Sequence, residues 1–183
     1  GALRLKSSQH QRGNDTFDVK LDVFDDKADP STAVGLAKNI VGKHQYHAVI
    51  DGINSGTAIP VAKIFEEAGL INFALGATNP KLTLAGHQWV FRMSMNDDRL
   101  PFSTYWAVSH RLKDTPAVFV HDGTAYGELT AQGFASAHRT LTDKHVELHN
   151  LGLNGDTDLA AVRDMKGTEA VLFVGGLDLF ATN

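Results

Sequence analysis

Short apolar runs alternate with segments of helical period through most of the 183-residue chain. The clearest pair begins with an apolar run of strand length over residues 47–53, followed by a small polar turn and by helical spacing over residues 59–68. A second apolar run over residues 70–75 leads through another small polar segment to Pro80, which suits a first helical position. The pattern predicts two successive strand-to-helix units whose loops lie at the same edge of a parallel sheet.

The same alternation continues on both sides of these two units. Residues 17–25 alternate apolar and polar positions, the pattern of a strand with one covered face. Asp29 and Pro30 then open a helix as its cap and its first turn. Later strands are expected near residues 89–93, 116–120, 146–151 and 170–174, and later helices over residues 101–112, 124–141 and 157–165. Such regular alternation predicts an α/β fold with parallel sheets and right-handed crossovers.

Small polar residues gather where the two central strands end. Ser55 follows the first strand and Thr78 follows the second, so both lie outside the carboxyl ends of parallel strands, where open α/β sheets bind ligands. Two helix N-termini at this edge favour an anion such as a carboxylate. The simpler alternatives are that Ser55 only caps a helix and that Asn79 and Pro80 only stabilise a turn.

Composition and charge exclude several classes of protein. Hydrophobic residues make up 43% of the chain and charged residues 21%, the balance of an ordinary globular protein. The formal net charge of −4, with scattered Lys and Arg, argues against a nucleic-acid-binding surface. No apolar run approaches the roughly 20 residues that span a bilayer, and no secretory signal peptide is recognisable. The absence of cysteine excludes a disulfide framework and leaves the compartment undecided.

Motifs for catalysis and for metal binding are missing from the sequence. It contains no GxSxG, no GxGxxG after a strand, no GxxxxGK[ST] and no HExxH, so we expect no catalytic residues and no cofactor. Among nine histidines, two close pairs are His44 with His47 and His145 with His149. Neither pair shares a helix face with a carboxylate, and we therefore expect solvated surface histidines and no metal site.

Three sequence blocks occur in order within residues 17–174: DDKADPSTAVGLAKNIV, VIDGINSGTAIPVAKIFEEAGLINFALGATNPKLT and VFVHDGTAYGE. Their order and spacing resemble the leucine/isoleucine/valine-binding proteins, the type I periplasmic receptors of branched-chain amino acid ABC transporters. The resemblance implies two Rossmann-like lobes with parallel sheets, which close on a small amino acid and present the closed form to a membrane permease. It also implies a periplasmic location and binding without a covalent step.

The resemblance assigns one wall of the ligand site to the first central loop. Ser55 matches the serine whose hydroxyl and N–H group hold the α-carboxylate of the ligand. Ile53 and Asn54 match its neighbours, whose backbone lines the same wall. We therefore expect a carboxylate at the start of the helix that follows.

The second central loop and lobe two supply the other expected contacts. Gly76, Ala77 and Thr78 match the segment in which a backbone carbonyl and the threonine hydroxyl meet the ligand ammonium, while N–H groups meet its carboxylate. Tyr126 matches the aromatic residue that closes over the ligand from lobe two. Asp178 falls near a strand end where relatives place a ligand-facing residue, often a tyrosine.

Length sets the expected domain organisation. Members of the family are roughly twice as long, so we expect the chain to be incomplete, with residues 1–96 forming lobe one without its first strand and residues 97–183 forming part of lobe two. The boundary is expected within a few residues of Asp97, where the polar segment lacks the period of either neighbour. The resemblance implies an acidic partner for the ligand ammonium in lobe two, which we expect beyond Asn183.

Three other functions are weighed against an amino-acid receptor. Asn54 and Asp178 depart from the commoner family residues, which leaves open a receptor for an amide, an aromatic acid or another small carboxylate. The effector-binding domain of a transcriptional regulator is disfavoured by the acidic charge and by the lack of a recognisable DNA-binding helix pair. An enzyme would be distinguished by turnover, and the missing motifs argue against it.

Overall fold

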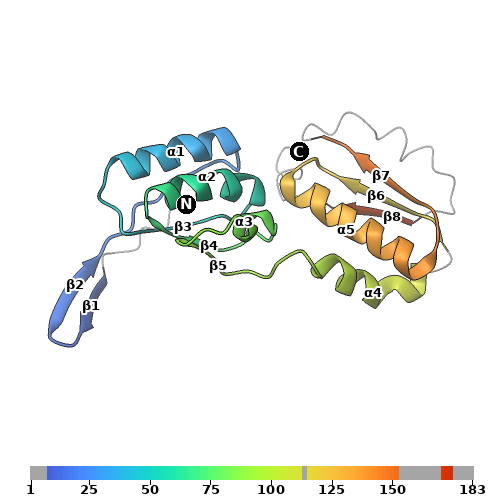
Figure 1. Cartoon of the computed structure of the whole chain (residues 1–183), viewed down its shortest axis with the longest axis horizontal. Helices are drawn as coiled ribbons and strands as arrows, with labels where there is room; N and C mark the ends of the chain where they lie inside the picture. Colours follow the sequence, from blue (N-terminus) through green and yellow to red (C-terminus); the bar gives the residue numbers. More distant parts are fainter. Residues whose placement is uncertain (1–7, 113–114, 153–169, 175–183) are drawn as a thin grey trace.

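The computed structural model describes residues 8–112, 115–152 and 170–174, which form two parallel sheets with helices packed on them and one β-hairpin (Figure 1). We call the sheet β3-β4-β5 with its helices lobe one, and the sheet β7-β6-β8 with its helices lobe two. Strands and helices alternate along both lobes, which confirms the predicted α/β fold with parallel sheets.

Lobe one packs two helices on one face of its sheet. Its elements are α1 (Pro30–Gly42), β3 (Ala48–Asp51), α2 (Ser55–Glu67), β4 (Ile71–Ala74), α3 (Lys81–Leu84) and β5 (Val90–Arg92). The central strand β4 pairs in parallel with both neighbours. Figure 1 shows α1 and α2 side by side over the strands, and Ala33, Ala37 and Ile40 of α1 pack there against Val61 and Phe65 of α2.

The start of α1 follows the predicted local chemistry. Asp29 is the N-cap, and its carboxylate accepts a hydrogen bond from the Thr32 N–H at 2.7 Å, while Pro30 is the first helical residue. Hydrogen bonds from the Ser31 and Thr32 side chains, and from the Thr32 backbone, lower the pKa of Asp29 to about 2. The cap is therefore charged at neutral pH and complements the helix dipole.

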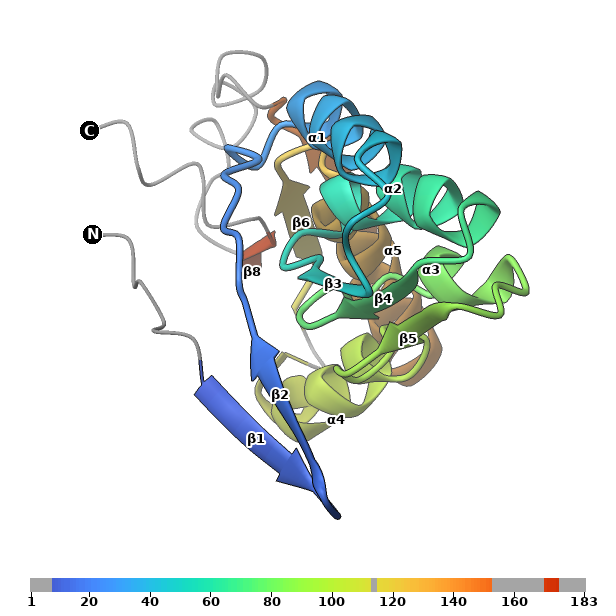
Figure 2. The same ribbon diagram turned by 90° about the vertical axis from the view of Figure 1, so that its left-hand side faces the viewer.

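The strand expected over residues 17–25 is correct only in part. The structure has a hairpin of β1 (Ser8–Arg12) and β2 (Asp15–Val19), joined by the two-residue loop Gly13-Asn14, a hairpin signal that the sequence analysis did not use. Beyond Val19 the chain runs to α1 without pairing with another strand (Figure 2). The side chains of Leu21 and Val23 are exposed. Alternating polarity cannot make a strand where no neighbour pairs with its backbone groups.

Lobe two is centred on a fully buried strand. Its elements are α4 (Leu100–Leu112), β6 (Ala117–His121), α5 (Ala125–Thr142), β7 (Val146–Asn150) and β8 (Ala170–Val174). The parallel strands β7 and β8 flank β6. These bounds agree within a few residues with the predicted ones, and the helix expected over residues 157–165 lies outside the described residues.

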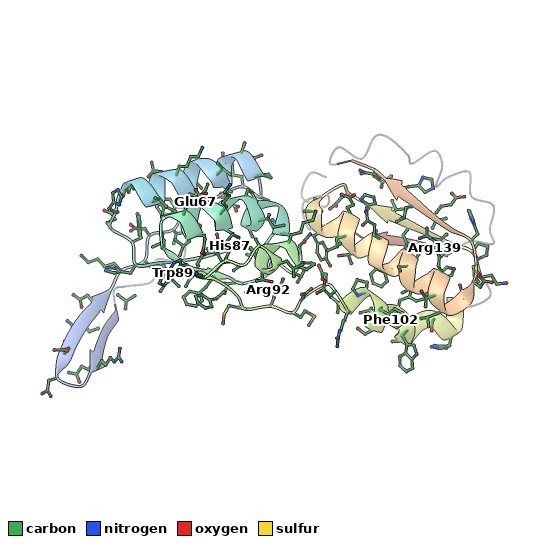
Figure 3. All side chains as sticks on the ribbon, viewed as in Figure 1. Glu67, His87, Trp89, Arg92, Phe102 and Arg139 are labelled. Atoms are coloured by element: carbon green, nitrogen blue, oxygen red, sulfur yellow. The ribbon has the colours of Figure 1, made fainter. Side chains whose placement is uncertain are left out.

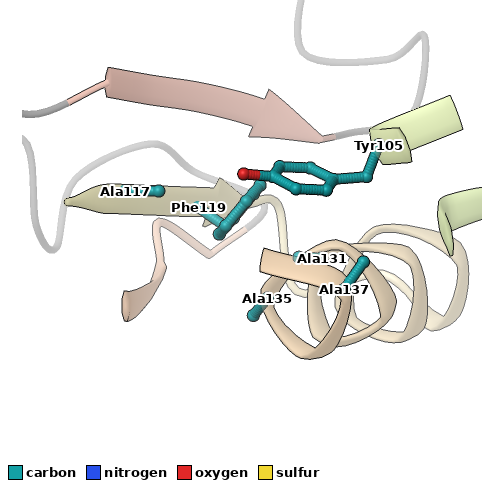
Figure 4. Packing of buried hydrophobic residues seen from close by; sticks show 6 residues of the cluster. All are labelled: Tyr105, Ala117, Phe119, Ala131, Ala135 and Ala137. Atoms are coloured by element: carbon teal, nitrogen blue, oxygen red, sulfur yellow. The ribbon is translucent and has the colours of Figure 1, made fainter. Parts of the chain in front are cut away.

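A polar pair lies in the core of lobe two. Figure 4 shows Tyr105 reaching from α4 across Phe119 of β6 toward α5. The Tyr105 hydroxyl is hydrogen-bonded to Nδ1 of His138, both residues are fully buried, and Nε2 of His138 has no partner among the described residues. Burial lowers the pKa of His138, because the imidazolium form would have to lose its hydration.

We expect lobe two to lose stability on acidification through His138. The folded state keeps this imidazole neutral, whereas the unfolded chain takes up a proton as the pH falls through the ordinary pKa of about 6.5. Stability is thus retained above that pH and declines below it. Thermal unfolding from pH 8 to pH 5 should show a smaller acid loss in His138→Phe than in the wild type. The exposed substitution His110→Phe serves as the control, and identical pH slopes in wild type and His138→Phe would contradict the prediction.

Candidate functional site

The carboxyl ends of β3 and β4 bring the two predicted loops into direct contact. The Gly52 carbonyl accepts hydrogen bonds from the N–H groups of Gly76 at 2.9 Å and Ala77 at 2.6 Å. Gly76 also lies against Ile53, so closely that a Cβ atom at Gly76 would stand 3.1 Å from the Ile53 Cα and carbonyl oxygen. Only glycine allows the two loops to come this close without displacing the backbone, so the contact between them requires Gly76.

Ser55 is the first residue of α2 and does not cap it. The N-cap is Asn54, whose backbone is extended and whose carbonyl accepts from Ala58 N–H at 3.0 Å. The buried Ser55 Oγ instead accepts the N–H of Asn79 at 3.2 Å. A hydroxyl that accepts at one lone pair keeps its own proton, so Ser55 can also donate a hydrogen bond to another group. Ser55 and Gly56 also carry the first N–H groups of α2, which lack intrahelical partners.

Thr78 is paired with a carboxylate that the sequence analysis assigned only to the lobe boundary. The Thr78 hydroxyl donates to Asp97 Oδ2 at 2.6 Å, and the Asp97 N–H donates back to the Thr78 carbonyl at 3.0 Å. Asp97 is 4% exposed, and its Oδ1 is buried without a hydrogen-bond partner among the described residues. Burial raises the pKa of Asp97, against the Thr78 hydrogen bond and the Arg92 charge, which lower it.

Asp97 could have been found from its position in the sequence. It follows the third apolar run, at the same sheet edge as the two loops, where an acidic side chain is a candidate for binding as well as for a hinge.

Arg92, a second residue that the sequence analysis missed, holds the second loop in shape. Its Nη1 donates to the carbonyls of Thr78 at 3.3 Å and Asn79 at 3.1 Å, and its Nη2 donates to Thr83 Oγ1 at 2.9 Å. Figure 3 shows Arg92 near α3, on the part of lobe one closest to lobe two. The loop is thus fixed before any ligand arrives.

The expectation of two helix N-termini at the site needs correction. The second helix, α3, has only four residues, and Pro80 precedes it as the N-cap. Aligned peptide dipoles add up with length, so a single turn contributes little. The Asn79 side chain accepts from the Lys81 N–H at 3.0 Å and occupies that donor. The field that favours an anion therefore comes from α2.

Tyr126 lies at the start of α5, the part of lobe two that meets lobe one. The N-cap Thr124 accepts from the Gly127 N–H at 3.0 Å, and Asp122 Oδ1 accepts from the Thr124 hydroxyl at 2.6 Å. Tyr126 is half-buried, and burial together with the negative charge of Asp97 raises its pKa. The tyrosine ring is therefore within electrostatic reach of the Thr78–Asp97 pair.

The structure brings together seven of the expected site residues. They are Ile53, Asn54, Ser55, Gly76, Ala77, Thr78 and Tyr126, on three loops or helix starts. Asp178 lies outside the described residues. Each lobe contributes, because Asn79 Nδ2 donates across the junction to the Ala125 carbonyl at 2.9 Å.

Metal binding finds no support in the described parts of the chain. No group of three or more histidine and carboxylate side chains there could hold an ion. On β7, the Glu147 carboxylate bridges His145 at 3.1 Å and His149 at 3.0 Å. The side chain of His145 is 70% exposed, as expected, whereas that of His149 is only 18% exposed. No described helix is both long and apolar enough to cross a membrane.

Comparison with known families identifies the family to which the chain belongs. The model of a family described as "Periplasmic binding protein" matches residues 4–177. The chain belongs to this family. The amino acid binding protein of Pseudomonas aeruginosa is 30% identical over 161 residues, covering 87% of this chain and 43% of the relative. Leu/Ile/Val-binding protein homolog 3 of Brucella melitensis is 32% identical over 162 residues, covering 86% of this chain and 43% of the relative. The chain thus spans less than half the length of these relatives.

Solved structures of similar fold hold two kinds of ligand. An ABC transporter substrate-binding protein from Desulfitobacterium hafniense in complex with Leu aligns with a TM-score of 0.58 and 26% identity, covering 72% of this chain and 38% of that one. A solute-binding protein from R. palustris in complex with benzoate aligns with a TM-score of 0.68 and 22% identity, covering 77% of this chain and 39% of that one. The second likeness supports the fold alone. Both are consistent with the type I receptor architecture.

We expect Gly127→Ala to disrupt the start of α5. An added Cβ would stand 2.2 Å from Asp122 Oδ1 and would break the hydrogen bonds that hold Thr124. The cost should be about 1–3 kcal/mol of unfolding free energy, measured by chemical denaturation. Gly35→Ala is the matched control, since nothing lies within 4 Å of its Cβ position in α1, and it should stabilise by roughly 0.5–1 kcal/mol. Equal effects at both positions would contradict the proposed collision.

Proposed function

We propose that this chain carries part of the ligand site of an extracytoplasmic solute-binding protein of an ABC transporter, which binds a small amino acid of the branched-chain type between two lobes. The proposal rests on one observation: hydrogen-bond donors and a buried carboxylate both lie where the two lobes meet. Unpaired N–H groups and a donor hydroxyl lie at the start of α2, and a buried carboxylate lies beside Thr78. A zwitterion is the ligand that matches both.

The carboxylate of the ligand would lie at the start of α2. Ser55 and Gly56 offer backbone N–H groups, and the Ser55 hydroxyl, which accepts from Asn79 N–H at one lone pair, can still donate its proton to the ligand. Charge-assisted hydrogen bonds to such donors are stronger than neutral ones. The helix dipole adds to the same preference.

The ammonium group of the ligand would lie between Thr78 and Asp97. Thr78 donates its own proton to Asp97, so the Thr78 oxygen can accept one from the ligand. Asp97 Oδ1 is buried and lacks a partner among the described residues, which costs free energy unless a donor arrives. An ammonium supplies both the donor and the compensating charge.

Closure of the lobes would complete the binding site. The negative charge of Asp97 contributes to the raised pKa of Tyr126 at the start of α5, and the exposed Ile53, with 70% of its surface accessible, offers an apolar contact beside the loop. Hinge closure of rigid lobes shifts a population and requires no covalent step. The closed form would then be presented to a membrane permease in the periplasm.

An aromatic carboxylate is the second candidate, because a protein of the same fold is in complex with benzoate. Such a ligand would satisfy the donors at α2 but would leave Asp97 Oδ1 without a partner and facing an apolar ring. The buried carboxylate of Asp97 therefore favours the amino acid.

A ligand screen on the natural full-length protein tests the proposal. Leucine, isoleucine, valine, glutamine and benzoate would be compared by thermal shift and calorimetry, because ligand binding to the native state raises the melting temperature. We expect a branched-chain amino acid to give the largest shift. A shift with benzoate and none with any amino acid would replace the leading proposal by the second candidate.

Substitutions of the two hydroxyl residues test the assigned contacts. Ser55→Ala and Thr78→Val should each weaken binding of the best amino acid by about 1–3 kcal/mol, the cost of leaving a buried charged partner short of one hydrogen bond. Thr140→Val, at an exposed position of α5, is the control and should leave the Kd unchanged. Unchanged calorimetric affinity in both site variants would remove these residues from the site.

Asp97→Asn separates the two candidate ligand classes. The exchange keeps the shape of the side chain and removes its charge, so binding of an amino acid should weaken by about 1.5–3 kcal/mol. Binding of benzoate, which carries no ammonium, should be unchanged or tighter. The pKa of Tyr126 should fall at the same time, since the charge of Asp97 contributes to raising it, and absorbance titration measures this directly.

A further inference from the structure

Asn79 makes hydrogen bonds in three separate directions from a buried position. It is 2% exposed, and its backbone N–H donates to Ser55 Oγ at 3.2 Å. Its side-chain Oδ1 accepts from the Lys81 N–H at 3.0 Å, within lobe one. Its side-chain Nδ2 donates to the Ala125 carbonyl at 2.9 Å, in lobe two. One residue thus contacts the expected carboxylate binder, the second loop and the opposite lobe.

The loop that carries Asn79 is held rigidly from the other side. Arg92 Nη1 donates to the Asn79 carbonyl at 3.1 Å and to the Thr78 carbonyl at 3.3 Å. These bonds limit the movement of Asn79, the residue that donates to Ala125. A hydrogen bond from such a fixed donor restricts the position of its acceptor more than a hydrogen bond from a mobile side chain does. The Ala125 carbonyl is therefore held at a defined place relative to lobe one.

The acceptor lies one residue from Tyr126. Ala125 is the first residue of α5, and Figure 1 shows that this end of the helix is the part of lobe two nearest to α2 and α3. A bond at Ala125 fixes where α5 begins and so fixes the approach of Tyr126 to Asp97, whose charge reaches the tyrosine. Loss of the bond would free the helix start while leaving each lobe intact.

We propose that Asn79 is a latch between the lobes: its side-chain amide holds the start of α5 against the ligand loop and favours the arrangement in which Tyr126 faces the site. The consequence for ligand affinity rests on the proposed function, whereas the effect on lobe arrangement does not. If only the latched arrangement binds tightly, the apparent Kd rises as the latched fraction falls.

The chemistry of the amide allows the two roles of Asn79 to be separated. Asn79→Asp keeps the Oδ1 that accepts from Lys81 but loses the donor to Ala125 and sets a negative oxygen against its carbonyl. Asn79→Ser keeps a short acceptor and cannot reach lobe two. Gln45→Glu, the same amide-to-carboxylate exchange at an exposed loop residue, is the matched control.

The experiment measures the distance between the lobes directly. The 183 residues contain no cysteine, so spin labels can be placed at Lys38→Cys on α1 and Ser136→Cys on α5, both exposed. Double electron–electron resonance would give the distance distribution in each background. In Asn79→Asp and Asn79→Ser the ratio of latched to open populations should fall about five- to tenfold, and Gln45→Glu should match the wild type.

Two results would overturn the latch. Distance distributions that are unchanged in both folded Asn79 variants, with folding checked by circular dichroism, would show that the bond does not hold the lobes. Equal broadening in Gln45→Glu would show that added charge alone is responsible. Calorimetry with leucine on the same variants should show a matching rise in Kd; if no variant and no wild type binds leucine while the distances still change, the ligand assignment fails and the latch stands.

Discussion

The parallel pairing of β3 with β4 is the constraint on which the site depends. The register sets Asp51 opposite Ala74, so both strands end at one edge and their loops must leave the sheet together. The Gly52 carbonyl then accepts two N–H groups of the following loop, and Gly76 lies directly against Ile53. The contact between the two loops follows from this approach. A shift by one residue would send alternate side chains to the other face and separate the loops.

The hydrogen-bond donors and the carboxylate where the two lobes meet come from different parts of the chain. The positive side comes from backbone N–H groups at the start of α2, together with one hydroxyl whose oxygen is already occupied by Asn79. The negative side comes from a single carboxylate, Asp97, which is buried, paired with Thr78 on one oxygen and unpaired on the other. An unpaired buried oxygen is costly, which in the proposed function favours a zwitterion over a simple acid as the ligand.

The loop proposed to bind the ligand also makes a contact between the lobes. Thr78 and Asn79 are adjacent; one contacts Asp97 after β5, and the other contacts Ala125 at the start of α5. Arg92 fixes both of their carbonyls, so the loop acts as a rigid unit between the lobes. In lobe two, the N-cap of α5 is Thr124, and its hydroxyl donates a hydrogen bond to Asp122. In the proposed function, ligand recognition and lobe closure therefore share one backbone segment.

The sequence by itself determined the order of the elements, because the periods of strands and helices are local properties. It located the helix starts at Pro30 and Ala125 closely through caps and turns, whereas α2 begins at Ser55, within the segment predicted to be a turn. Three ordered blocks identified the family. Tertiary structure decided which polar atoms remain unpaired and which segments pair at all. Thr78 and Asp97 stand 19 positions apart, and Asn79 and Ala125 stand 46 apart. Residues 20–26 have an alternating pattern but gain no strand, since pairing requires a neighbour that periodicity does not specify. Contacts at such separations depend on how whole sheets and helices pack, and no local pattern of polar and apolar residues encodes them.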